Sequence, residues 1–76
     1  MQQFEIKLFI NNVEECMQVQ EDKAPSGTYL ITQNQKFIAR VFKDSDGKWK
    51  TREISDLSPS VVEAIGLEIN SALNLG

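Results

Sequence analysis

The sequence predicts an α+β fold, in which an antiparallel sheet of about five strands packs against one C-terminal helix. Between Thr28 and Ile54, β-branched and aromatic runs are interrupted twice by short segments containing Asn, Asp or Gly. This pattern is typical of an antiparallel meander. Residues 4–10 alternate as a half-buried strand does, and residues 61–73 carry an apolar stripe with helical spacing. Together these three observations define the fold class.

The first two strands are expected to form a hairpin. Asn11 and Asn12 suit a two-residue turn, because Asn tolerates a positive φ better than most residues do. A helix over residues 13–20 is the alternative to the second strand, since Glu, Met and Gln are good helix formers. The expected strands are Phe4–Ile10, Val13–Gln20, Thr28–Gln33, Lys36–Lys43 and Lys48–Ile54.

The register of the meander follows from its two turns. A two-residue turn at Asn34 and Gln35 would pair Ile31 with Ile38 and place Tyr29 opposite Arg40. Pairing of Lys43 with Lys48 would then bring Phe42 opposite Trp49. One face would carry Tyr29, Ile31, Ile38, Phe42 and Trp49, and the other would carry Leu30, Phe37, Ala39, Val41 and Ile54. Both faces are apolar in this register, which predicts that both sides of the sheet are covered, at least in part.

The helix is expected at Ser58–Asn74. Ser58 is a good N-cap residue, and Pro59 suits the first helical position because it has no N–H to satisfy. Gly66 lies at the edge of the apolar stripe and costs about 1 kcal/mol relative to Ala, so we expect close packing there, against Trp49 or Phe42. Leu67 points away from the stripe. The stripe consists of Val61, Val62, Ile65, Ile69, Ala72 and Leu73.

Length and composition indicate one small domain spanning residues 1–76. The chain is 41% apolar and 25% charged, as ordinary soluble domains are. No segment has the roughly 18 apolar residues needed to cross a bilayer, and the first residues lack the pattern of a signal peptide. We therefore expect a complete cytoplasmic protein without a membrane segment.

Several chemistries are excluded by residue type. The chain has no histidine, which removes Ser-His and Cys-His nucleophiles and most zinc sites. Its single cysteine, Cys16, cannot form an intramolecular disulfide and is expected to be structural. The segment Asp44-Ser45-Asp46-Gly47 resembles the start of a calcium loop, but the closing Glu would fall at Glu53, inside a strand, so we interpret it as a hairpin turn. We expect no enzyme activity, catalytic residue, cofactor or metal site.

Charge is unevenly distributed along the chain. Residues 36–53 contain six basic and three acidic side chains, whereas the whole chain has a net charge of −3. We expect a non-catalytic protein-binding or regulatory module. The alternative is weak binding of single-stranded nucleic acid through the basic and aromatic sheet surface of residues 36–52, which the acidic net charge opposes. The candidate interaction residues are Phe9, Lys36, Arg40, Lys43, Lys48, Trp49, Lys50, Arg52 and Leu67.

Two states of association are compatible with an apolar sheet. In a closed monomer, the first hairpin folds over the second sheet face and leaves Phe9 as the main exposed aromatic residue. In a symmetric homodimer, a second copy covers that face or an edge. We favour the monomer, because Glu14, Glu15, Lys43 and Lys48 would discourage pairing at exposed edges.

The last 50 or so residues resemble a class of short bacterial proteins of unknown function. The shared features are Tyr29-Leu30-Ile31, a turn, Phe37-Ile38-Ala39, a lone Trp49, and Leu57 followed by Val61-Val62 and Ile65-Gly66. The resemblance implies a fold and no activity. The order of hairpin, three-stranded sheet and helix is also similar to that of small archaeal chromatin proteins, although those proteins are strongly basic and this chain is acidic.

Overall fold

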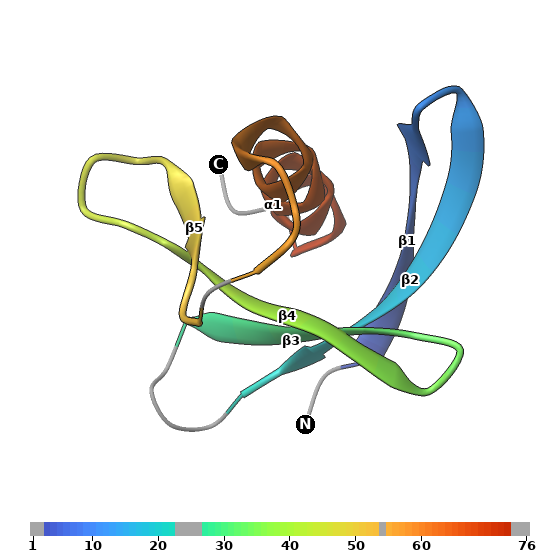
Figure 1. Cartoon of the computed structure of the whole chain (residues 1–76). Helices are drawn as coiled ribbons and strands as arrows, with labels where there is room; N and C mark the ends of the chain where they lie inside the picture. Colours follow the sequence, from blue (N-terminus) through green and yellow to red (C-terminus); the bar gives the residue numbers. More distant parts are fainter. Residues whose placement is uncertain (1–2, 23–26, 54, 74–76) are drawn as a thin grey trace.

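The computed structural model of the chain describes residues 3–22, 27–53 and 55–73. One antiparallel sheet, with the strand order β1-β2-β3-β4-β5, packs against a single C-terminal helix, α1 (Figure 1). The predicted α+β fold is confirmed, and the helical alternative for residues 13–20 is wrong. The elements are β1 (Gln3–Ile10), β2 (Val13–Glu21), β3 (Thr28–Gln33), β4 (Lys36–Lys43), β5 (Trp49–Thr51) and α1 (Pro59–Leu73).

The sheet curls around the helix. In Figure 1, β5 and the β1–β2 hairpin rise on either side of α1, while β3 and β4 pass beneath it. The helix therefore contacts β1, β4 and β5. We call the sheet face towards α1 the inner face and the opposite one the outer face. The core consists of Ile6, Leu8, Met17, Val19, Tyr29, Ile31, Ala39, Val41, Trp49, Val62, Ile65 and Ile69.

Both two-residue turns use left-handed backbone. Asn11 and Asn12 have φ values of 53° and 65°, and Asn34 and Gln35 have values of 53° and 66°. Positive φ at both central residues matches the right-handed twist of the flanking strands. Each turn therefore fixes the register of its hairpin, with Ile10 opposite Val13 and Gln33 opposite Lys36.

A β-bulge at Ile38 shifts the register between β3 and β4. Thr32 lies opposite Phe37, but Ile31 lies opposite Ala39, and Ile38 is the extra residue between these pairs. The predicted pairing of Ile31 with Ile38 is therefore wrong. Because successive side chains alternate between faces, this single insertion turns Ala39 and Val41 to the inner face, where both are buried.

The second meander turn is longer than predicted. Lys43 lies opposite Trp49, and Phe42 lies opposite Lys50. The predicted pairs Lys43–Lys48 and Phe42–Trp49 are wrong, because Asp44 to Lys48 form a loop in which Gly47 has a φ of 84°. The Trp49 side chain consequently reaches the inner face and Phe42 the outer one. Strand β5 has only three residues, and Ile54 lies outside the described residues.

The outer face has no second layer over it in the described part of the chain. The closed-monomer expectation required the first hairpin to fold over the second face. The hairpin instead extends the sheet beside α1. The observed strand register makes this arrangement possible, because it turns the side chains of Ala39, Val41 and Trp49 towards the inner face. The expectation that both faces are apolar is wrong, because Arg40 and Lys50 lie on the outer face.

The helix begins as the sequence predicts. The Ser58 side chain accepts a hydrogen bond from the Val61 N–H at 3.3 Å, which is the N-cap interaction. Val62, Ile65, Gly66 and Ile69 are buried, whereas Leu67 is 61% exposed. The predicted end at Asn74 lies outside the described residues.

Candidate interaction surface

Arg40 is neutralised within the outer face. Its guanidinium donates to the Glu53 carboxylate at 2.9 Å, and it lies 3.7 Å from a carboxylate oxygen of Asp22. The hydrogen bond to Glu53 and the charges of Glu53 and Asp22 raise the pKa of Arg40. A phosphate would have to displace two carboxylates to bind this side chain.

Lys50 is held by the β4–β5 loop. Its ammonium donates to Asp44 at 2.6 Å and to Asp46 at 3.3 Å. The hydrogen bond from Lys50 lowers the pKa of Asp44, and the hydrogen bond from the Lys48 N–H lowers the pKa of Asp46. These two carboxylates serve a turn and its lysine, and the hairpin-turn interpretation of this segment agrees with that arrangement.

The two aromatic side chains expected on the basic surface are covered. The Arg52 guanidinium carbon lies 4.0 Å from the centre of the Phe42 ring, a cation–π contact. Arg52 also donates to the Thr28 hydroxyl at 3.1 Å. Trp49 is 5% exposed and lies on the inner face, 6.0 Å from the Tyr29 ring centre. The outer face therefore offers no free aromatic ring of residues 42 or 49 on which a base can stack.

The remaining candidate residues do not form one surface. Lys36 and Lys43 are exposed at the two ends of β4, Lys48 is exposed in the β4–β5 loop, and none of them has an ion pair among the described residues. Phe9 is 72% exposed on β1, whereas Leu67 is exposed on the side of α1 that faces away from the core. Of the nine predicted residues, the structure brings together only Arg40 of β4, Lys50 of β5 and Arg52, which directly follows β5, on the outer face.

A groove lined by apolar and polar residues lies where the chain passes from β5 to α1. It consists of two adjoining depressions of about 300 and 330 Å³ that share Asp56 and Leu57. We call it the Leu57 groove. Phe37, which is 58% exposed, borders it. Its other lining residues are Asn11, Ser55 and Ser58 together with the apolar residues Ile10, Ile38 and Val61.

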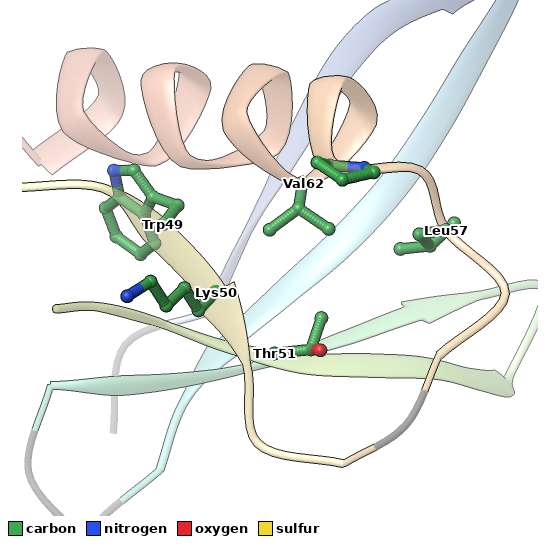
Figure 2. Close-up of a pocket in the computed structure, with 6 residues that line it drawn as sticks. Trp49, Lys50, Thr51, Leu57 and Val62 are labelled. Carbon is green, nitrogen blue, oxygen red and sulfur yellow. The ribbon is translucent and has the colours of Figure 1, made fainter.

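A second hollow lies between β5 and the start of α1. Figure 2 shows Trp49 and Lys50 on opposite sides of β5, with the indole directed towards the helix and Val62 pointing down towards Thr51. The hollow has a volume of about 230 Å³ and adjoins a depression of about 510 Å³, with which it shares Trp49, Lys50 and Pro59. It carries no cluster of reactive groups, and we assign it no ligand.

The free edge of β5 is partly closed by the helix. The Trp49 backbone N–H points away from β4 and donates to the Glu63 carboxylate at 3.0 Å. An edge-strand N–H is a template for pairing with another chain. Glu63 of the same chain already binds this N–H group.

Comparisons with known proteins give this chain no relatives from which a role can be transferred. The chain matches no protein-family model, no curated protein and no solved structure. Among the described residues, no group of three or more His, Cys, Asp or Glu side chains is placed to hold a metal ion. In the same part of the chain, no helix is both long enough and apolar enough to cross a membrane.

Proposed function

We propose that this chain is a non-catalytic protein-binding module that receives an apolar side chain of its partner in the Leu57 groove. The main supporting observation is that five apolar residues from β1, β4, the β5–α1 connection and α1 line one groove, and that one of them, Phe37, is exposed. Exposed apolar side chains around a concave surface are typical of protein-interaction sites.

The charge of the groove suggests the chemistry of the partner. Asp56 lines both depressions and is exposed, and it has no ion pair among the described residues. A basic side chain beside the apolar anchor would pair with it. The net charge of −3 favours the approach of such a partner. The partner class is therefore a protein segment with an apolar residue flanked by Lys or Arg.

The nucleic-acid alternative has weaker support. Arg40 and Lys50 are bound to carboxylates, Trp49 is buried, and Arg52 covers Phe42. What remains for phosphate contacts is Arg52 and the three exposed lysines of residues 36–48. Fluorescence anisotropy with a labelled single-stranded oligonucleotide at low salt should show no binding. Tight, salt-dependent binding would instead support the alternative and contradict the groove proposal.

The groove is tested by two matched substitutions. Phe37 and Leu67 are 58% and 61% exposed, so Phe37→Asp and Leu67→Asp add the same charge at similarly exposed apolar sites. Partners captured from cells of the source organism should be lost with Phe37→Asp and retained with Leu67→Asp. Circular dichroism checks that both variants fold. A partner that survives Phe37→Asp and is lost with Leu67→Asp would overturn the assignment of the groove.

A further inference from the structure

The outermost strand of the sheet has a long free edge. Strand β1 spans Gln3–Ile10 and has only β2 as a neighbour in the described sheet. The two-residue turn makes Ile10 and Val13 a hydrogen-bonded pair, and such pairs recur at every second residue. The N–H and C=O groups of the intervening residues therefore point away from β2. These residues are Gln3, Glu5, Lys7 and Phe9.

The two edges of the sheet differ in how they are protected. Strand β5 has three residues, and Glu63 binds the outward N–H of Trp49. Strand β1 has eight residues and no proline. The devices that usually prevent edge pairing are short strands, proline, bulges, charged side chains and a covering helix or loop. Strand β1 contacts α1, and its own residues contribute only two charges, Glu5 and Lys7.

These two charges favour one register for pairing with a second copy, because only that register places them opposite each other. Both side chains are exposed on the outer face, and Lys7 has no ion pair among the described residues. In a two-fold antiparallel pair that joins outward-pointing residues, a central Glu5 would face Glu5, and a central Lys7 would face Lys7. Like charges directly opposite each other destabilise a sheet. The register centred on Ile6 instead places each Glu5 opposite a Lys7.

From this complementarity we infer that the protein forms a homodimer in which β1 pairs antiparallel with β1 of a second copy. Glu5 lies opposite Lys7 of the partner subunit, and Ile6 lies opposite Ile6 of the partner subunit on the inner-face side. Half-buried Phe4 lies opposite Leu8 of the partner subunit. The two sheets become one continuous sheet of ten strands, since each contributes five. The same register brings apolar residues together on one face and opposite charges together on the other.

The dimer and the Leu57 groove are separate proposals. Pairing uses residues 3–9, whereas the groove depends on Phe37, Leu57 and their neighbours. Failure of the dimer leaves the groove assay unchanged, and failure of the groove assay leaves the association state unchanged.

Charge reversal tests the register directly. The variants are Glu5→Lys, Lys7→Glu and the double swap Glu5→Lys/Lys7→Glu, with Lys48→Glu as a control at an exposed lysine remote from β1. Sedimentation velocity across micromolar concentrations should show a dimer for the parent chain and for Lys48→Glu. Each single reversal creates two like-charge pairs and should weaken the dimer by about tenfold or more. The double swap should restore it, because opposite charges again face each other.

Mixing the single variants gives a second, independent readout. One chain then has two lysines at positions 5 and 7, and the other has two glutamates. A mixture of Glu5→Lys and Lys7→Glu should therefore form a heterodimer although each variant alone dissociates. A parent chain that stays monomeric at every concentration would overturn the proposal. A dimer that neither single reversal weakens, or that the swap does not restore, would overturn the register and with it the β1 interface.

Discussion

Gly66 of α1 lies directly against the indole ring of Trp49 on β5, so that a methyl group at Gly66 would overlap the ring. This close contact explains why a glycine stands in the middle of the helix. Of the two contacts predicted for Gly66, the structure shows the one with Trp49. This contact brings α1 close to β5 and buries the largest side chain of the core. Trp49 is also the residue whose backbone N–H is bound by Glu63, one helical turn before Gly66.

The Gly66→Ala variant should therefore be destabilised. Helix propensity alone would favour Ala by about 1 kcal/mol. Overlap with the Trp49 ring forces α1 or β5 to move, and such overpacking typically costs about 1–3 kcal/mol. Urea denaturation should show a lower midpoint for Gly66→Ala, whereas Ser71→Ala, at an exposed helical site, should not lower it. A higher midpoint for Gly66→Ala would mean that the two elements are not in close contact.

Substitutions along α1 should reveal its buried side. Ile65 is fully buried, and Ile65→Ala should reduce the free energy of unfolding by about 2–5 kcal/mol through lost burial and a cavity. Leu67 is 61% exposed, and Leu67→Ala should change it by less than about 0.5 kcal/mol. The measurement is again the denaturant midpoint. Equal losses at both positions would contradict the observed orientation of the helix.

Glu63 should matter through its contact with the edge of β5. Glu63→Ala removes the acceptor for the Trp49 N–H and should cost about 1–2 kcal/mol. Glu63→Gln keeps an acceptor of similar reach and should cost less. Amide hydrogen exchange at Trp49 should accelerate in the Ala variant. Unchanged protection of that amide would show that the carboxylate contributes nothing there.

Acid should weaken the β4–β5 loop. Lys50 lowers the pKa of Asp44, so the ionised carboxylate stabilises the folded chain. That stabilisation is present above the ordinary Asp value of 3.8 and is lost as the pH falls through the lower folded value. The difference in unfolding midpoint between the parent chain and Lys50→Met should therefore be positive at neutral pH and shrink below pH 3.8. A difference independent of pH would exclude this ion pair as its source.

The fold could be predicted because its signals are local. Asn-containing turns, alternating strands and the Ser58-Pro59 helix start each depend on residues within a few positions of one another. The strand register could not be predicted from local signals. The extra residue at Ile38 and the five-residue loop after Lys43 both depend on which side chains fill the inner face. Packing of Ala39, Val41 and Trp49 under α1 is a tertiary effect that no local turn rule contains.

The candidate surface was predicted less well, for a related reason. Charged residues close in sequence suggested one basic patch, but Arg40 binds carboxylates that only the folded chain brings near, and Lys50 binds the two carboxylates of the β4–β5 loop. The Leu57 groove joins Ile10, Phe37 and Val61, which are far apart in sequence. Phe37, an apolar residue at the start of β4, was the only sequence signal for the groove that we identify. Its neighbours in the groove could not be recognised without the strand register.

Contact of α1 with both β1 and β5 links the order of folding to the order of synthesis. The first strand leaves the ribosome early, yet the inner side of Ile6 and Leu8 is completed by the last helix. We therefore predict that nascent chains ending before residue 59 lack a stable sheet, and that folding becomes cooperative only when α1 has emerged. Pulse-labelling hydrogen exchange on stalled chains would test this order. Protection of β1 amides before the helix is synthesised would show that the hairpin is stable alone.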